Sequence, residues 1–265
     1  MKKSRFWGTL PEITEYSIVS EKIPAFFDNF RIAHISDTHS KPVDEIFELV
    51  KSQNPDIICL TGDLFHEGKT DAPKVWTLLR NLSDLAPVYL ITGNHDLWYK
   101  NSPEIKEKIA KTGVVLLDGN MHIFERNGER IALFGVGDTF SKLPKKIQKN
   151  VSSQFENLPD FDGYKILLYH RANLFDLIKD FGFNLILSGH MHGGQIRTPH
   201  LGGLLAPLSS RFYGRMILPK YTWGEFVHKN TVMIVNRGCS NTLPIPRILN
   251  PSEVGIITLR HKNKA

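Results

Sequence analysis

One stretch of the sequence, RIAHISDTH at residues 31–39, indicates the fold more clearly than any other. Its first part is an apolar run typical of a buried β-strand, and the run ends in Asp37 and His39. Two similar runs follow. The run at 56–60 precedes Asp63, and the run at 88–91 precedes Asn94. Each of these three predicted strands is followed by side chains that can bind ligands or act in catalysis. The pattern predicts a sheet that carries a functional site along one edge.

Helix-forming stretches separate these strands. Apolar residues recur at helical spacing over 43–50. Pro73 stands in the first turn of a second helix that runs to Leu82, with Asp71 as the expected cap. A third helix is expected from Pro103 to 111. Strands that alternate with helices predict an α/β chain whose first sheet is mostly parallel.

The second half of the chain has a mixed pattern. Asn127-Gly128 is a hairpin signal between strands expected at 121–125 and 130–136. A strand, a helix and a strand are then expected, followed by three further strands. These lie at 166–169, 174–181, 185–187, 222–227, 232–235 and 254–259. We see no repeat or linker, so we expect residues 1–265 to form one domain, with a motif-bearing core at about 31–260.

Composition sets wider limits. The 265 residues are 41% hydrophobic, enough for a sizeable core, and 33 basic against 27 acidic side chains give a net charge of +6. This charge favours anionic partners but also fits a mildly basic soluble protein.

Cys59 lies in an apolar run, so we expect buried free thiols rather than a disulfide with Cys239. No run approaches the roughly 18 apolar residues of a spanning helix. Residues 1–7 lack the apolar core of a signal peptide, so we expect a protein that is cytoplasmic or peripheral to a membrane.

Residues that commonly bind metals follow five of the predicted strands. Ligands bind outside the carboxyl ends of strands in open α/β sheets, so we expect these side chains to meet. Carboxylates, imidazoles and one amide oxygen suit manganese, zinc or iron. Each fragment alone is ordinary turn chemistry, but the ordered set predicts a metal centre. The expected ligands are Asp37, His39, Asp63, Asn94, His170, His190 and His192.

The ordered pattern D-x-H, G-D, G-N-H-D, H, G-H-x-H resembles the calcineurin-like metallophosphoesterase superfamily over about residues 31–260. LSGHMHGGQI at 187–196 is similar to the LSGHTHGGQI of the YkuE-type bacterial phosphodiesterases. Arg237-Gly238, 244–247 and 250–253 are similar to the closing segment of that branch.

Four positions depart from related patterns. Thr38 stands where the branch usually has leucine, and Met191 stands where it has threonine. Residues 171–173 replace a turn that usually contains proline. His66 stands where the purple acid phosphatases need a tyrosine ligand, and we expect it to be a solvated loop residue rather than to face a metal.

The resemblance implies an α/β four-layer sandwich, with two mixed β-sheets flanked by helices. It also implies two divalent metal ions, with manganese favoured, and attack on phosphorus by a hydroxide that bridges them. One ion would take Asp37, His39 and His192, the other Asn94, His170 and His190, and Asp63 would bridge. His95 is the expected proton donor to the leaving group. Asp96 either orients the His95 ring or caps a helix.

The substrate is less defined. The resemblance implies a small-molecule or lipid-linked phosphodiester or pyrophosphate, such as UDP-2,3-diacylglucosamine. A phosphomonoesterase, a metal-dependent nuclease and a non-catalytic scaffold are the alternatives. Nucleic acid is disfavoured as a partner because we find no long basic stripe with interleaved aromatic residues. The amphipathic segment 195–223 is either a connection packed on the core or a flap that contacts a membrane surface. The sequence leaves the oligomeric state open.

Overall fold

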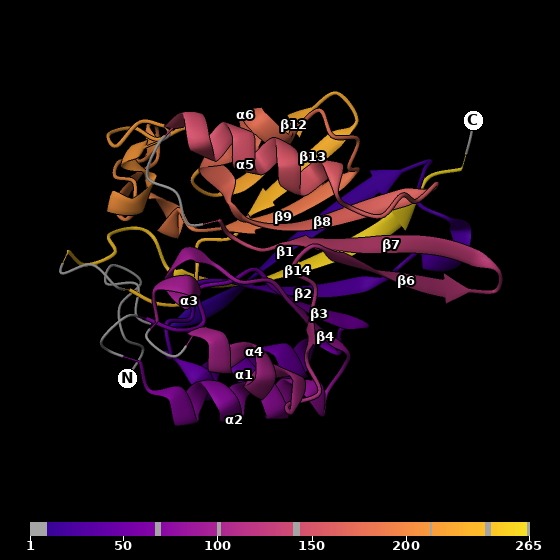
Figure 1. Cartoon of the computed structure of the whole chain (residues 1–265), viewed down its shortest axis with the longest axis horizontal. Coiled ribbons are helices and arrows are strands. Elements are labelled where there is room, and N and C mark those ends of the chain that lie inside the picture. The colour runs from indigo at the N-terminus through magenta and orange to yellow at the C-terminus, as the bar shows by residue number, and fades with distance from the viewer. Residues whose placement is uncertain are drawn as a thin grey trace.

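Two six-stranded β-sheets pack face to face, and helices cover the outer face of each, which gives four layers (Figure 1). The computed structural model describes residues 10–66, 70–99, 102–139, 144–212, 214–241 and 245–263. The fold class expected from the sequence is confirmed. That the chain forms a single domain stays a prediction.

Sheet one joins strands from both ends of the chain. In spatial order it contains β1 (Pro11–Ser20), β14 (Ser252–His261), β2 (Arg31–Ile35), β3 (Ile57–Leu60), β4 (Val88–Leu90) and β5 (Val115–Leu116). The sheet is parallel from β2 to β5, as predicted, while β14 runs antiparallel to β2. The sequence analysis missed β1, which pairs in parallel with β14.

Sheet two is parallel in its centre and antiparallel at both edges. In spatial order it contains β12 (Gly224–His228), β13 (Thr231–Val235), β9 (Leu185–Gly189), β8 (Tyr164–Arg171), β7 (Glu129–Val136) and β6 (Asn120–Arg126). The predicted hairpin joins β6 and β7. Asn127 and Gly128 have φ values of 50° and 81°, the left-handed conformation that two-residue hairpin turns require.

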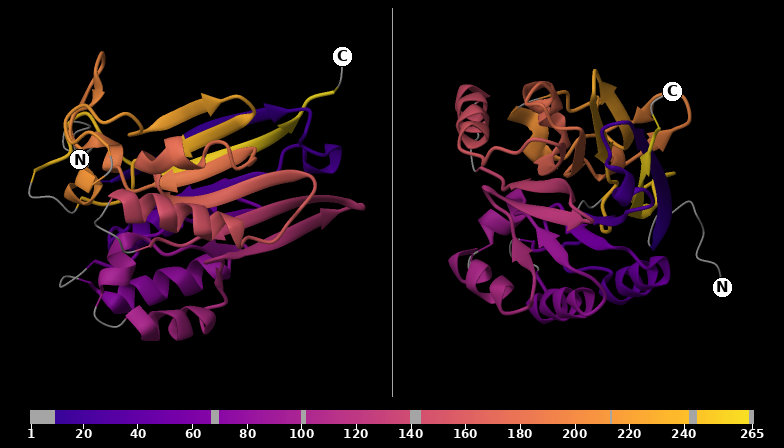
Figure 2. Two further views of the ribbon diagram at one scale, coloured as in Figure 1. Left: turned by 45° about the horizontal axis from the view of Figure 1, so that its top comes forward. Right: turned by 90° about the vertical axis from the view of Figure 1, so that its right-hand side faces the viewer.

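The helices divide between the two outer faces (Figure 2). Sheet one is covered by α1 (Val43–Gln53), α2 (Ala72–Ser83) and α4 (Ser102–Ala110), which confirms the three predicted helices. Sheet two is covered by α5 (Pro144–Glu156), which was not predicted, and α6 (Phe175–Ile178).

The helix expected at 174–181 is wrong in extent, because the chain forms a 3₁₀ turn, η3 (Ala172–Leu174), before the short α6. Asp71 occupies the N-cap position of α2, but its side chain makes no capping hydrogen bond and lies 3.2 Å from Lys74 instead.

Alternation along the central strands builds three apolar layers. In β3, Ile57 and Cys59 face the other sheet, whereas Ile58 and Leu60 face the helices. Both cysteines are buried free thiols, as predicted. Cys239 belongs to the layer under the helices rather than to the layer between the sheets. This two-sided burial fixes the position of each strand end.

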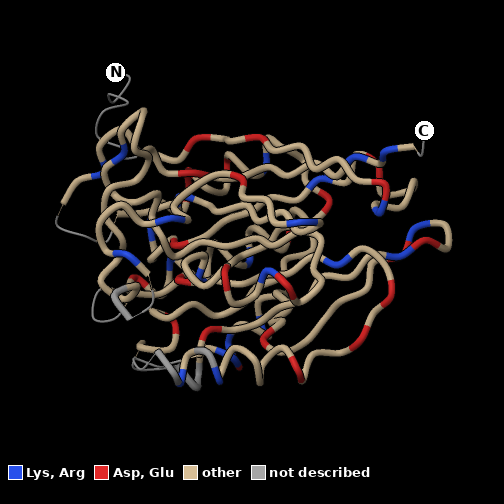
Figure 3. Tube along the Cα trace, turned by 90° about the horizontal axis from the view of Figure 1, so that it is seen from above, with Lys and Arg blue, Asp and Glu red and all other residues tan. Residues whose placement is uncertain are grey.

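The charges on the described part of the chain are mixed in sign. Lysine and arginine are interspersed with aspartate and glutamate along the trace (Figure 3). Among the described residues, no helix combines the length and apolarity needed to cross a membrane. Residues 1–7, Tyr213 and Pro244, and the side chains of Arg211 and Phe212, lie outside what the structure describes.

Candidate metal centre

The carboxyl ends of the central parallel strands of both sheets meet at one end of the sandwich. Helix α3 (Asn94–Trp98) marks this end at the left of Figure 1. Sheet one contributes the loops after β2, β3 and β4, and sheet two contributes the ends of β8 and β9. All seven predicted ligands lie here, and none is more than 5% exposed. The structure therefore brings the whole predicted set together.

The backbone at the site is held in an uncommon conformation. Five of the seven residues have positive φ, a region that non-glycine residues rarely adopt and that concentrates at functional sites. They are Asp37 (52°), His39 (44°), Asp63 (54°), His190 (72°) and His192 (47°). Hydrogen bonds between the loops maintain these conformations, since Asp37 N donates to Gly62 O at 3.0 Å and His39 N donates to Asp63 O at 3.0 Å. At Gly62, a Cβ would lie 2.5 Å from Gly93 N, so the loops after β3 and β4 approach closely only because no side chain is present.

A first group of donors consists of Asp37, His39 and His192, whose ligand atoms lie within 4.8 Å of one another. Asp37 Oδ2 accepts hydrogen bonds from Ser36 Oγ at 2.6 Å and from the backbone of His190 at 2.9 Å. The other oxygen, Asp37 Oδ1, lies 3.5 Å from His192 Nε2. Within the described chain, Asp37 Oδ1 and His39 Nε2 are buried without a hydrogen-bond partner, which fits atoms that could bind a cation.

A second group consists of Asp63, His170 and His190, again within 4.8 Å. His170 Nε2 lies 3.2 Å from Asp63 Oδ2 and 3.2 Å from His190 Nδ1. Asn94 joins this group, because its Oδ1 lies 3.2 Å from the same His170 nitrogen. His170, which departs from the usual sequence context, is thus placed with the other predicted ligands.

Asp63 lies between the two groups. Its Oδ2 is 3.2 Å from His170 Nε2 and 4.0 Å from His39 Nε2. The other oxygen, Oδ1, accepts the backbone N–H of His95 at 2.8 Å. One carboxylate oxygen therefore faces both groups while the second fixes the carboxylate orientation.

The outer nitrogens of several imidazoles have partners that determine which nitrogen faces the cluster. His39 Nδ1 donates to Phe65 O at 3.2 Å, and His170 Nδ1 donates to Thr61 O at 2.7 Å. His190 is held by a side chain instead, since its Nε2 lies 3.0 Å from Ser210 Oγ. The contact of His192 differs, because Nη2 of the buried Arg247 can only donate and lies 3.2 Å from His192 Nδ1.

Burial keeps most of these rings in the form that binds metals. It lowers the pKa of His39 and of His192 to about 3 and lowers the pKa of His190 well below its usual value, so these rings are neutral. Burial also lowers the pKa of His170, but Asp63 at 3.2 Å more than offsets this and raises the pKa to about 10. A neutral imidazole and an ionised carboxylate are the ligand forms that divalent cations require.

His95 sits at the mouth of the site, half-buried between buried neighbours. Three rings surround it, each with its centroid 4.9 Å away: His39 and Trp98 edge-on and His66 stacked. The expectation that His66 is solvated is wrong, because its half-buried ring packs on His95 and lies 5.3 Å edge-on from His39. The described residues His39, His66 and His95 also form a third group with ligand atoms within 4.8 Å.

Asp96 makes the hydrogen bonds expected of a cap. Its carboxylate accepts the backbone N–H groups of Gly93 and Asp63 at 2.8 Å and of Phe65 at 2.9 Å. Burial and the nearby Asp63 raise the pKa of Asp96 to about 7. Among the described contacts, none joins this carboxylate to the His95 ring. An orienting role for Asp96 toward His95 therefore stays a prediction without a supporting contact.

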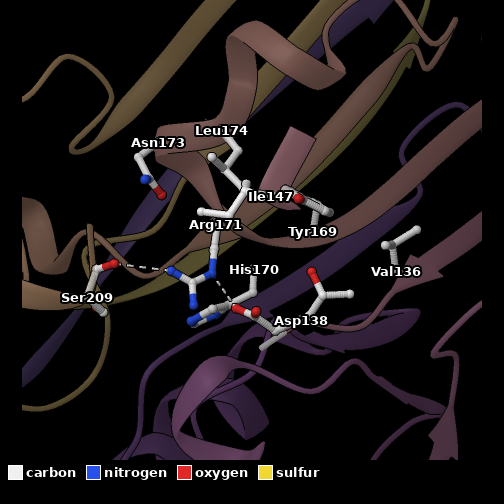
Figure 4. Close-up of a pocket in the computed structure, with 10 residues that line it drawn as sticks. Val136, Asp138, Ile147, Tyr169, His170, Arg171, Asn173, Leu174 and Ser209 are labelled. Carbon is white, nitrogen blue, oxygen red and sulfur yellow. Dashed lines mark hydrogen bonds and ion pairs between the residues drawn. The ribbon is translucent and has the colours of Figure 1, made fainter. Parts of the chain in front are cut away.

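Two contributors to the site carry no recognisable sequence pattern. Arg171, next to His170, donates from Nε to Asp138 at 2.6 Å and from Nη1 to Ser209 O at 3.4 Å (Figure 4). Ser210 contacts His190, as described above. The contacts of Arg171 with Ser209 and of Ser210 with His190 depend on residues 207–212 folding back over the strand ends, which no local periodicity predicts.

A sandwich of two mixed sheets with Asp, His and Asn donors at the strand ends is the arrangement that the sequence pattern predicts for a metal-dependent phosphoesterase. The sequence model of the calcineurin-like phosphoesterase family matches residues 30–194. The chain belongs to this family and is a metallophosphoesterase.

Individual relatives agree with this assignment. The chain is 30% identical over 262 residues to the uncharacterized metallophosphoesterase YkuE of Bacillus subtilis (strain 168), covering 95% of this chain and 86% of the relative. It is 25% identical over 210 residues to the phosphodiesterase YaeI of Escherichia coli (strain K12), covering 75% and 74%. The crystal structure of TT1561 of Thermus thermophilus is similar in fold, with a TM-score of 0.51, 13% identity, and coverage of 79% of this chain and 90% of that one.

Proposed function

We propose that this chain hydrolyses phosphodiester or pyrophosphate bonds with two divalent cations, of which manganese is favoured over zinc and iron. Asp37, His39 and His192 would hold one cation, and Asn94, His170 and His190 would hold the other. Asp63 would contact both. The single observation that carries this proposal is the position of Asp63 Oδ2, which faces a nitrogen of each group at 4.0 and 3.2 Å.

The donor chemistry fits this proposal. Two carboxylates, four imidazoles and one amide oxygen match borderline divalent cations rather than calcium, which prefers oxygen ligands alone. Bound cations of this kind supply Lewis acidity toward phosphoryl oxygens and lower the pKa of water. Because only two of the seven ligands are anionic, a site with two such ions would keep a net positive charge and attract a phosphate diester.

His95 would act at the leaving group. His95 is half-buried, whereas its neighbours Asn94 and Asp96 are buried. Of these three residues at the start of α3, His95 is therefore the one that a substrate can reach. Its backbone N–H donates to Asp63 Oδ1, which ties this residue to the proposed bridging carboxylate, and its ring lies 4.9 Å from that of His39. An imidazole there can donate a hydrogen bond or a proton to the departing oxygen.

A phosphodiester is favoured over other phosphoesters because YaeI, a relative, is named a phosphodiesterase. A nucleotide- or lipid-linked substrate such as UDP-2,3-diacylglucosamine belongs to this proposal. Basic and acidic residues alternate along the trace in Figure 3, which does not favour the nuclease alternative, since that calls for a continuous basic track. The phosphomonoesterase alternative uses the same centre and differs only in the substrate.

The segment 195–223 supports a peripheral membrane contact as a secondary proposal. Among the described side chains of this segment, four apolar ones are exposed: Leu201 (65%), Leu208 (68%), Ile217 (70%) and Leu218 (44%). Arg215 and Lys220 lie exposed among them. We propose that the protein acts in the cytoplasm or at a membrane surface. Flotation with anionic liposomes tests this, and a protein that stays at the bottom of the gradient would retire the membrane contact.

Hydrolysis of two chromogenic substrates tests the main proposal. With added Mn²⁺, we expect faster turnover of bis-p-nitrophenyl phosphate than of p-nitrophenyl phosphate, and loss of both activities in EDTA. Preference for the monoester would favour the phosphomonoesterase alternative. Activity that is unchanged after exhaustive chelation would contradict the proposed role of the cations.

A further inference from the structure

Ser210 is a buried serine whose hydroxyl reaches one of the proposed metal ligands. It is 1% exposed, and its Oγ lies 3.0 Å from His190 Nε2. The opposite nitrogen of the same ring, Nδ1, faces His170 Nε2 at 3.2 Å inside the second donor group. The two nitrogens of His190 therefore have distinct environments, one inside the cluster and one against Ser210.

A second contact of the same hydroxyl bears on the direction of this hydrogen bond. The Ser210 hydroxyl donates to Met191 Sδ at 3.5 Å. A hydroxyl has one proton to donate. Because Ser210 directs that proton at the Met191 sulfur, its oxygen accepts the hydrogen bond from His190 Nε2–H. The proton of the neutral imidazole then resides on Nε2, and Nδ1 presents its lone pair to the cluster.

The surrounding loop holds Ser210 in this place. Leu218 N donates to Leu204 O and Ala206 N donates to Met216 O, both at 2.9 Å, so the two sides of the loop run antiparallel. At its tip, the 3₁₀ helix η5 (Leu208–Phe212) begins with a hydrogen bond from Ser210 N to Pro207 O at 2.8 Å.

Two further contacts tie the loop to the metal centre. The backbone N–H groups of Leu204 and Leu205 donate to Gly194 O at 3.1 and 3.0 Å, close in sequence to His192. Arg171, which follows His170, contacts Ser209 O (Figure 4). The loop is therefore anchored beside ligands on both β8 and β9.

We infer that Ser210 is a positioning residue that fixes the tautomer of His190 and thereby tunes the affinity of the second donor group for its cation. This inference rests on the proposed function, in which His190 is a ligand. It also assigns a role to Met191, because the thioether that stands in place of the usual threonine accepts the hydrogen bond of the serine hydroxyl. The corresponding outer nitrogens of His39 and His170 are held by backbone carbonyls, so of these three rings His190 is the one that depends on a side chain.

Zinc titration with a competing chromogenic chelator tests this inference in the 265-residue chain. Wild type is expected to bind two ions and His190→Ala to lose one. Ser210→Ala is expected to weaken one of the two sites about 10- to 100-fold, the usual effect of removing a hydrogen-bond partner of a ligand, and to leave the other within about twofold. Ser210→Thr, which keeps the hydroxyl, is expected to recover most of that loss. The matched control is Ser209→Ala, which removes the neighbouring hydroxyl but keeps the carbonyl that Arg171 contacts, and it is expected to bind as wild type does.

A direct measurement guards against a simple folding defect. In the zinc-loaded wild type, ¹⁵N chemical shifts of the His190 ring should report a proton on Nε2. A proton on Nδ1 would overturn the inference, whatever the stability of the variants.

Other outcomes separate the inference from the proposed function. If Ser210→Ala binds both ions as wild type does, or if Ser209→Ala loses as much affinity, the positioning role is wrong while the metal centre stands. If wild type binds no zinc and His190→Ala behaves identically, the proposed function itself fails.

Discussion

The backbone N–H of His95 donates to Oδ1 of Asp63 at 2.8 Å, which links the residue at the mouth of the site to the carboxylate between the two donor groups. The other Asp63 oxygen remains directed at His39 and His170. The two oxygens of Asp63 therefore have different partners. The contact with His95 orients the carboxylate and also holds the backbone of His95 next to it. The variants below separate these functions.

Asp63→Asn tests the carboxylate between the groups. The amide retains an oxygen for the His95 N–H but loses the charge that two cations would share, so we expect fewer than two bound ions. Several kcal/mol of stabilisation would be lost, which corresponds to a fall in kcat of about 10²–10⁴-fold. Metal content by mass spectrometry and kinetics with a phosphodiester measure both effects. Full occupancy with wild-type turnover would contradict the assignment.

His95→Ala separates chemistry from metal binding. We expect the variant to keep both ions, because the ring lies outside the two proposed ligand sets, and to lose about 10²–10⁴-fold in kcat, the range typical of general acid–base groups. Metal analysis of the same preparation is the control. A variant that loses an ion together with its activity would make His95 a ligand.

His66 is expected to support His95 by ring packing. Aromatic ring pairs contribute about 0.5–1.5 kcal/mol, so His66→Ala should lower kcat about 2- to 10-fold. His66→Phe keeps a ring at this position and should retain more of the activity than the alanine variant. Loss of a bound ion in both variants would instead indicate a ligand role within the group of His39, His66 and His95.

Asp96 is expected to act mainly on stability. Asp96→Ala leaves three backbone N–H groups without their acceptor, and each unsatisfied buried donor costs about 1–3 kcal/mol. We expect the free energy of unfolding to fall by about 3 kcal/mol or more in denaturant titrations. The exposed Asp84 offers a control, since surface substitutions usually stay within about 0.5 kcal/mol. A stable Asp96→Ala protein that is inactive would restore the orienting role toward His95.

The sequence predicted the central strands well and the edges poorly. The strands β2, β3 and β9 are buried on both faces almost throughout and are rich in apolar residues, which makes them easy to recognise. β1 alternates irregularly between exposed and buried residues, and its place beside β14 depends on a partner at the far end of the chain. Helix α5 has its buried apolar residues Ile147, Val151 and Phe155 four apart, a helical pattern that the sequence analysis overlooked.

The site residues were predictable wherever a potential metal ligand stands at the end of a strand. All seven expected ligands lie together because each lies at or just after the end of a strand whose position is fixed by burial. Contacts made by loops were not predictable. The stack of His66 on His95 depends on how the chain after β3 approaches α3, and the contact of Ser210 with His190 depends on a loop folding back over β9. Neither approach leaves a periodic pattern in the sequence.

The most direct test of the central claim is an anomalous-diffraction crystal structure of the manganese-loaded protein. The account predicts two ions on either side of Asp63, one within coordination distance of Asp37, His39 and His192 and the other within reach of Asn94, His170 and His190. A single ion, or an ion held by His39, His66 and His95 with Asp63 uncoordinated, would contradict it.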